Sequence, residues 1–154
     1  MPIFNPSTQE MIGAIFLGMR VDKAANTSPL ASADLFTIKG GRVLMILLVG
    51  EVTSQIQAQA TTIQFASNPD VGAPINISGN TTDLTGAAAG VQLGITGTAA
   101  GQVLKAQALA PMQAQPVVLS AGKLSVVYGA GSTGAIKYSI WYIPLDDGAY
   151  VEAA

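Results

Sequence analysis

The clearest strand pattern in the chain lies in two apolar runs, residues 35–38 and residues 43–49. A Gly-Gly pair separates them at positions 40–41, and such a pair suits a tight two-residue turn. The sequence therefore predicts a hairpin over residues 35–49. The second run is apolar at every position, which predicts that both of its faces are covered, within a sandwich or by another subunit. We accordingly expect Leu47→Asp to prevent soluble folding.

Shorter strand-like runs follow along the rest of the chain. Residues 61–65 alternate between apolar and polar, and residues 68–74 contain the Asn, Pro and Gly of a turn. Near the C-terminus, residues 123–128 and 135–143 are predicted to pair across the loop 129–134. Alternation in the last of these runs assigns Ile136, Tyr138, Ile140 and Tyr142 to one face, and Lys137, Ser139, Trp141 and Ile143 to the other.

Many short strands, with turn signals between them and no long helical period, predict an all-β fold. We expect a β-sandwich or jelly roll of short antiparallel strands over residues 34–154. Residues 1–33 are expected to be an N-terminal arm or a first strand with loops, because Gly13 and Gly18 weaken helix and strand alike in the apolar stretch 11–19. In the arm alternative, this segment is extended and reaches a neighbouring molecule.

The stretch from residue 84 to residue 104 carries no charge and repeats itself. LTGAAAGVQL at residues 84–93 is echoed by ITGTAAGQVL at residues 95–104. Two copies are too few for a solenoid, so we expect two similar strand-turn units. No Gly-Lys-Ser/Thr sequence follows these glycines, which excludes a phosphate-binding loop. Small uncharged residues suit close contact with a neighbouring surface or a mobile loop.

The composition indicates a protein that works in an assembly. Only 10% of the 154 residues are charged and 49% are hydrophobic, whereas an ordinary soluble domain has about a quarter charged residues. This excess predicts a dimer or trimer whose contacts use uncharged residues from region 79–101, the N-terminal arm or strand 138–143. The chain has seven Lys and Arg against nine Asp and Glu, with no basic cluster, so we expect no direct contact with nucleic acid.

The chain is expected to be soluble and made in a cytoplasm. Its longest apolar run, residues 43–49, is far shorter than the ~20 residues of a membrane helix. Its first residues lack a positively charged leader, so no signal peptide is expected. It contains no cysteine, which excludes disulfides and fits a reducing compartment.

The residue types that carry most enzyme chemistry are missing, because the chain has no histidine and no cysteine. We therefore expect no catalytic residues, no cofactor and no metal site. Asp146 and Asp147, with help from Asp70 or Glu152, could bind a hard cation such as Ca²⁺. No ligand spacing of a known loop is present, so the expected alternative is a solvated turn.

The other polar and aromatic candidates have structural explanations. Glu51 follows the long apolar run, and we expect an ion pair there, with Arg42 as a conceivable partner. Lys39 and Arg42 flank the Gly-Gly turn, where water is expected to solvate both and a partner carboxylate is the alternative. The aromatic residues near the C-terminus are Tyr138, Trp141, Tyr142 and Tyr150. They could form a sugar-stacking platform, but core and interface packing is the default for aromatics on a strand.

The run LFTIKGGRVLMILLVGEVT at residues 35–53, with AQATT at residues 58–62 and Asn68-Pro69 after it, resembles small virion proteins encoded among the head genes of tailed bacteriophages. IWYIPL at residues 140–145 is similar to the final strand of such proteins. The likeness is weakest over residues 1–33. It rests on a strand pattern without a catalytic signature, and it implies no particular site residues.

The resemblance implies a capsid cement or decoration protein with a jelly roll or β-sandwich fold. Such a protein sits on the outside of an icosahedral shell and braces subunits of the major capsid protein. It is expected on the capsid surface of the virion, after synthesis in the host cytoplasm. Two other functions are weighed against it: a head-fibre or tail-associated protein that binds host glycans, and an enzyme that uses perturbed carboxylates.

Overall fold

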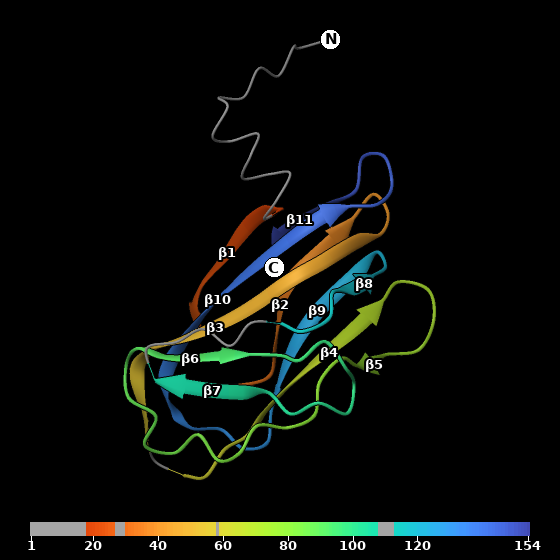
Figure 1. Ribbon diagram of the computed structural model, residues 1–154. Coiled ribbons are helices and arrows are strands. Elements are labelled where there is room, and N and C mark those ends of the chain that lie inside the picture. Colours follow the sequence, from red (N-terminus) through yellow and green to blue (C-terminus); the bar gives the residue numbers. More distant parts are fainter. Residues whose placement is uncertain (1–17, 27–29, 58, 108–112) are drawn as a thin grey trace, which may run out of the picture.

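The computed structural model describes residues 18–26, 30–57, 59–107 and 113–154, which form a sandwich of two antiparallel sheets (Figure 1). The six-stranded sheet has the order β1 (Met19–Asn26), β10 (Thr133–Pro144), β3 (Val43–Gln57), β6 (Val91–Gly94) and β7 (Leu104–Gln107), and β8 (Val117–Leu119) also pairs with β3. The five-stranded sheet has the order β11 (Tyr150–Ala153), β2 (Ala33–Lys39), β9 (Gly122–Tyr128), β4 (Ile63–Pro69) and β5 (Ile75–Asn76). The predicted all-β sandwich is confirmed. Within the described ranges, no helix has the length and hydropathy to cross a membrane.

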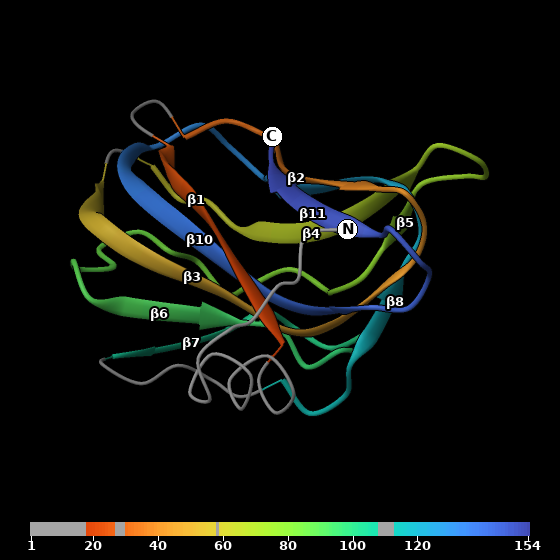
Figure 2. The ribbon, with the colours of Figure 1, turned by 90° about the horizontal axis from the view of Figure 1, so that it is seen from above.

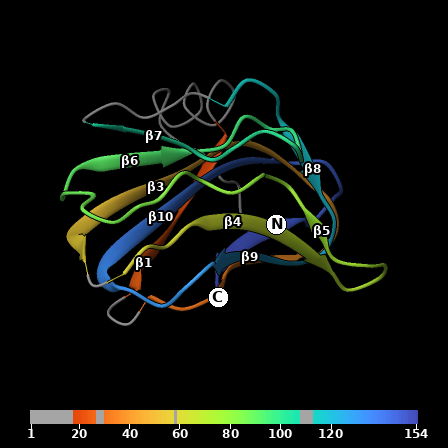
Figure 3. The ribbon, with the colours of Figure 1, turned by 90° about the horizontal axis from the view of Figure 1, so that it is seen from below.

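The core lies between the two sheets, which form separate layers when the molecule is seen from above and from below (Figure 2 and Figure 3). In β10 the four residues that the sequence places on one face, Ile136, Tyr138, Ile140 and Tyr142, are all buried, which confirms the alternation and shows that this face points into the core. Phe65 of β4 meets the Tyr138 ring edge-on, with the ring centroids 5.9 Å apart. Full burial of one such large apolar side chain contributes about 1.5–3 kcal/mol.

Consecutive strands mostly lie in opposite sheets, and the predicted hairpin over residues 35–49 is therefore wrong. β2 pairs with β11 and β9, whereas β3 pairs with β10, β6 and β8. Gly40 and Gly41 have φ of 75° and 145° and turn the chain from one sheet to the other. A Cβ on Gly40 would collide with the carbonyl oxygen of Gly148 in the β10–β11 connection. Glycine is required here because this corner packs closely against another corner.

The predicted pairing of residues 123–128 with residues 135–143 is wrong for the same reason. β9 lies between β2 and β4 in the five-stranded sheet, and β10 lies between β1 and β3 in the six-stranded sheet. The loop between them crosses the sandwich, and the Ser132 carbonyl oxygen in this loop accepts a 2.7 Å hydrogen bond from the Leu30 N–H. Strands that follow each other in sequence are spatial neighbours only about two-thirds of the time. Here, most connections join described strands that do not pair with each other.

β3 is a central strand, as the sequence predicts, but only one of its faces is fully buried. Met45 and Leu48 point into the core and are at most 1% exposed. Leu47 is half-buried on the outer face of the sheet. The premise behind the predicted effect of Leu47→Asp, that this residue lies in the core, is therefore wrong, and Leu48 is the neighbouring residue that does.

The sandwich includes residues before position 34. β1 pairs with β10 at the edge of the six-stranded sheet, and Leu30 is buried in the core. The predicted arm or first strand in the stretch 11–19 lies outside the described residues, apart from Gly18 and Met19 at its end. The strand that the structure shows begins where this apolar stretch ends.

Both copies of the internal repeat contain a glycine turn, but the predicted strand-turn unit is formed only by the first copy. β6 lies at the end of the first copy, β7 begins at the end of the second, and the two strands pair antiparallel. Gly86 and Gly97 occupy equivalent positions in the two copies and have φ of 81° and 92°. The likeness is partial, because Leu93 is buried whereas its counterpart Leu104 is 42% exposed.

Candidate functional site

One half of the outer face of the six-stranded sheet is apolar. Half-buried side chains of β3 and β10 form this surface, which we call the apolar face: Leu44, Ile46, Leu47, Val49, Trp141 and Ile143. Val118 of β8, which pairs with Leu44 and is 54% exposed, extends it. Adjacent branched and aromatic side chains of this kind can be covered by a partner without desolvation of a charged group.

An irregularity in β3 widens the apolar face. Leu47 pairs with Trp141 and Met45 pairs with Tyr142, so Ile46 is an extra residue between two paired positions. A bulge of this kind sets two residues of one strand opposite one residue of its neighbour. Ile46 and Leu47 are consequently both half-buried outside the core, whereas regular alternation would bury one of them.

The other half of this outer face carries charges from β1, β10 and β3. Arg20 and Asp22 form an ion pair of 2.8 Å, and the Ser139 hydroxyl donates a hydrogen bond of 2.5 Å to the Asp22 carboxylate. The Ser139 hydrogen bond, followed by the contacts of Arg20, holds the pKa of Asp22 below its usual value against the opposing effect of burial. Lys137 and Glu51 pair at 2.9 Å on adjacent strands. Arg20, Asp22, Lys137 and Glu51 in this half thus each have a partner of opposite sign.

The border between the two halves runs at Trp141. The Arg20 guanidinium lies over the Trp141 ring, 5.1 Å from its centroid, in the geometry of a cation–π contact. The predicted ion pair of Glu51 is present, but its partner is Lys137 and not Arg42. The strands thus sort their outward residues into a charged half and an apolar half of one surface.

The outer face of the five-stranded sheet is polar. Asp34 of β2 accepts hydrogen bonds from the Lys123 ammonium at 2.6 Å and the Ser125 hydroxyl at 2.7 Å, both of β9. Asn68 of β4 donates to the Ser125 hydroxyl oxygen at 2.7 Å, so the network crosses three strands. The hydrogen bonds of Lys123 and Ser125 hold the pKa of Asp34 below its usual value. A partner covering this network would have to desolvate it, which opposes binding.

Both cations beside the Gly-Gly corner have carboxylate partners, so the expectation that water alone solvates them is wrong. Lys39 pairs with Glu152 at 2.5 Å and Arg42 pairs with Asp146 at 2.8 Å. The Asp146 carboxylate also accepts a 2.7 Å hydrogen bond from the Arg42 backbone N–H. These hydrogen bonds from Arg42 lower the pKa of Asp146 to about 2. The two pairs join the β2–β3 corner to the C-terminal segment.

The same pairs occupy two of the carboxylates that the sequence offered for a cation. Asp146 faces Arg42 and Glu152 faces Lys39, while Asp147 and Asp70 lie in separate turns. Within the described part of the chain, no group of three or more Asp, Glu, His or Cys residues lies close enough to hold a metal ion. Asp146 is instead a structural partner of Arg42.

The four aromatic residues near the C-terminus do not form one platform. Tyr138 and Tyr142 are buried in the core, as expected by default for aromatics on a strand. Trp141 belongs to the outer face of the six-stranded sheet, and Tyr150 is exposed on β11 in the other sheet. A sugar that stacked on this protein would therefore contact Trp141 or Tyr150 alone, and not a platform of several rings.

The charge-free stretch 84–104 lies in and around β6, with buried anchors at Leu84, Leu93, Ile95 and Val103. Asp83, just before it, accepts hydrogen bonds from the backbone N–H groups of Thr85 and Thr61, both at 3.0 Å. These bonds lower the pKa of Asp83, with Thr85 contributing most. The carboxylate fixes the start of the stretch and has a structural role.

No family model, curated protein or solved structure matches this chain. The apolar face is the functional candidate because of its own chemistry. The sequence signal for it was the unbroken apolar run 43–49, together with the placement of Trp141 and Ile143 on the second face of their strand. The bulge at Ile46, which brings two β3 residues to this face at once, had no signal in the sequence.

Proposed function

We propose that the protein is a non-enzymatic structural component of a virion, a cement protein that binds the outer surface of an icosahedral bacteriophage capsid and stabilises contacts between major capsid subunits. The observation that carries the proposal is the contrast between the apolar face and the polar outer face of the five-stranded sheet. One side of the sandwich suits a protein partner, and the other suits water.

The segments that resemble phage head proteins supply this surface. Residues 35–53 include most of β3, and residues 140–145 include the end of β10. These two strands hold all six residues of the apolar face. The resemblance and the surface chemistry therefore support the same docking side, although each comes from a different kind of observation.

The composition supports attachment in many copies. On a symmetric shell, each further contact of a bound molecule is effectively intramolecular, so modest contacts add up to firm binding. A mostly apolar contact is also insensitive to salt, because screening weakens only interactions between charges. A chain with 10% charged residues fits such an interface.

The test adds purified protein to capsids that lack it and follows their resistance to heat. Wild-type protein should bind and raise the temperature at which the shells break, and electron microscopy should place it on the outer surface. Leu47→Asp sets a charge in the apolar face and should abolish binding, since an unpaired carboxylate would be buried at the contact. Val127→Asp, on the outer face of the five-stranded sheet, is the control and should bind like wild type.

Failure of the wild-type protein to bind any shell would contradict the proposal. Equal binding by Leu47→Asp and wild type would retain a capsid role but remove the apolar face from it. Density on a tail or fibre instead of the shell would favour the glycan-binding alternative.

A further inference from the structure

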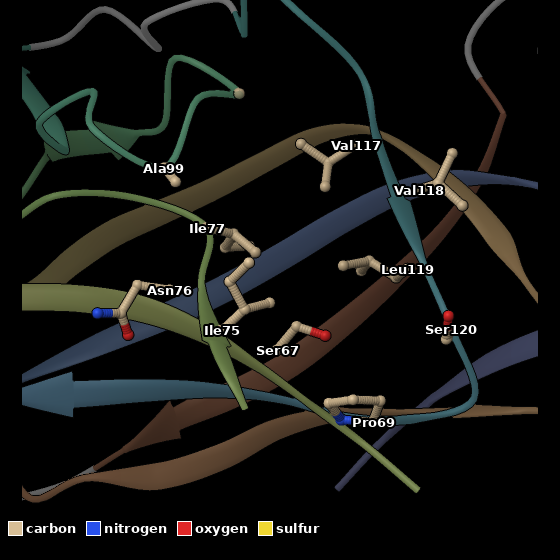
Figure 4. A pocket seen from close by; sticks show the side chains of 11 residues that line it. Ser67, Pro69, Ile75, Asn76, Ile77, Ala99, Val117, Val118, Leu119 and Ser120 are labelled. Atoms are coloured by element: carbon tan, nitrogen blue, oxygen red, sulfur yellow. The ribbon is translucent and has the colours of Figure 1, made fainter. Parts of the chain in front are cut away.

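A hollow of about 300 Å³ opens between the two sheets at the side of the sandwich where β5 and β8 lie (Figure 4). No residue that lines it is charged. Ile75 and Ile77 lie on one side and Val117 and Leu119 on the other, with their side chains directed across the hollow. Ile75 is 61% exposed, so water reaches the apolar interior of this hollow, which we call the β5–β8 slot.

Two strand edges border the slot. β5 is the last strand of the five-stranded sheet, and among the described strands β8 pairs with β3 alone. Such edges present N–H and C=O groups that can pair with an added strand. On the opposite side of the sandwich, where β1 and β11 lie, the Lys23 ammonium donates a hydrogen bond to the Ala154 carbonyl oxygen and links the two sheets.

Hydrogen bonds fix the walls of the slot. The backbone N–H groups of Ala114 and Gln115 both donate to the Thr96 carbonyl oxygen at 3.1 Å, which holds the loop that contains Gly97 and Ala99 beside the start of β8. On the other side, the Ile77 N–H donates to the Phe65 carbonyl oxygen at 2.9 Å. The slot is therefore a preformed feature of the fold, as ligand sites in proteins usually are.

We propose that the β5–β8 slot binds residues 11–17 of a second copy of this chain as an added strand. This segment, MIGAIFL, is uncharged like the slot and offers large apolar side chains on both faces of an extended strand. It precedes Gly18, where the described chain starts just before the edge strand β1. Fully extended, the seven residues of this segment would span about 23–25 Å from Gly18. The remaining domain has a radius of gyration of about 14 Å, so the segment is long enough to enter a neighbouring molecule that packs beside β1.

The donor is a second copy because of where the segment starts. β10 and β3 separate β1 from β8 in the sheet, which amounts to three strand spacings or about 14 Å. A segment that returned to its own slot along this path would cover the apolar face, which the proposed function assigns to the capsid. The choice of donor thus rests on the proposed function, whereas the slot itself does not.

Disulfide trapping tests the proposal, since the chain has no cysteine of its own. Ile15→Cys and Phe16→Cys place donor thiols on successive residues, and Ile75→Cys places a thiol in the slot. Val127→Cys is the matched control, because Val127 is an exposed apolar strand residue (40%) on the outer face of the five-stranded sheet. In mixtures under mild oxidation, one donor variant should cross-link to Ile75→Cys at least about tenfold faster than to Val127→Cys, because binding raises the local thiol concentration.

Equal cross-linking rates to Ile75→Cys and Val127→Cys with both donors would overturn the proposal. The double variants Ile15→Cys/Ile75→Cys and Phe16→Cys/Ile75→Cys show whether the segment in the slot belongs to the same chain or to a second copy. A disulfide within one chain that forms equally well at high dilution would refute the exchange between copies. No capsid enters this experiment, and Leu47→Asp tests capsid binding separately, so failure of either proposal is recognised without reference to the other.

Discussion

The two outer faces of this sandwich are built from strands of the same kind, yet they meet the solvent differently. On the five-stranded sheet, Asp34, Lys123, Ser125 and Asn68 form one connected polar network. On the six-stranded sheet, the corresponding area around β3 and β10 is the apolar face. One sheet satisfies its outward groups within itself, and the other leaves branched and aromatic side chains for something else to cover.

The difference teaches where the hydrophobic excess of the chain goes. The core takes up inward residues of both sheets, and those of β10 and β3 are almost completely buried. The surplus is concentrated on one half of the outer face of the six-stranded sheet and in the β5–β8 slot, whereas the outer face of the five-stranded sheet carries a connected polar network. A monomer built for water would spread such residues thinly.

The sharpest test of this contrast is a pair of adjacent residues on β3. Leu48→Asp buries an unpaired carboxylate in the core and should cost several kcal/mol, comparable with the whole stability of a domain. Leu47→Asp sets the same charge on the apolar face and should leave the isolated domain folded. Circular dichroism melts and the soluble yield of the two variants give the measurement. If both variants failed to fold, the outer side of β3 would be as much a part of the core as its inner side.

Much of the fold was predictable from local pattern. The alternation in residues 135–143 placed Tyr138 and Ile140 on one face correctly, and the glycine-rich repeat indicated the strand-turn unit that contains β6. These features depend on the chain within a few residues. A period of two in hydrophobicity is a direct consequence of strand geometry.

Strand partners were not predictable in the same way. Gly40-Gly41 reads as a hairpin turn, and nothing within the flanking residues says that the chain crosses to the other sheet there. The deciding contacts are remote, with Gly148 and Asp146 packed against this corner. The apolar face was open to prediction only in part, since the bulge at Ile46 depends on the register between β3 and β10.

A second test uses the hydroxyl pair that joins the two sheets inside the core. The phenol oxygens of Tyr128, on β9, and Tyr138, on β10, lie 2.7 Å apart. Tyr128→Phe leaves the fully buried Tyr138 hydroxyl without this partner and should cost about 1–3 kcal/mol. The double change to Phe removes both polar groups and should be nearer to wild type. A double-mutant cycle by chemical denaturation measures the coupling, and strictly additive losses would contradict a direct pair.

The same pair predicts the response of the interior to alkali. Burial raises the pKa of Tyr128 to about 12 and the pKa of Tyr138 well above its usual value. The fold therefore favours the protonated phenols, so their contribution to stability is complete below pH ~10 and is lost as the pH rises toward 12 and beyond. Melting temperatures should fall over this range in wild type and fall less in the double Phe variant. If the melting temperature fell equally steeply with pH in both proteins, the loss of stability in alkali would come from groups other than these two tyrosines.

The smallest expected effect concerns the polar face itself. Asp34→Asn removes the charge that Lys123 pairs with and should cost up to about 1 kcal/mol, because the pair is largely exposed. Lys123 and Ser125 lower the pKa of Asp34, so its contribution is present above pH ~4 and is lost as the pH falls through the lowered value. The stability of wild type should therefore drop more steeply than that of Asp34→Asn below pH 4 and should be more sensitive to salt at neutral pH, both measured by denaturant titration.

Asp147→Asn, in an exposed turn, is the control that should follow wild type. If Asp34→Asn kept the full acid and salt dependence of wild type, the charge of Asp34 would not stabilise the polar face. The two faces would then differ only in the apolar residues of the six-stranded sheet.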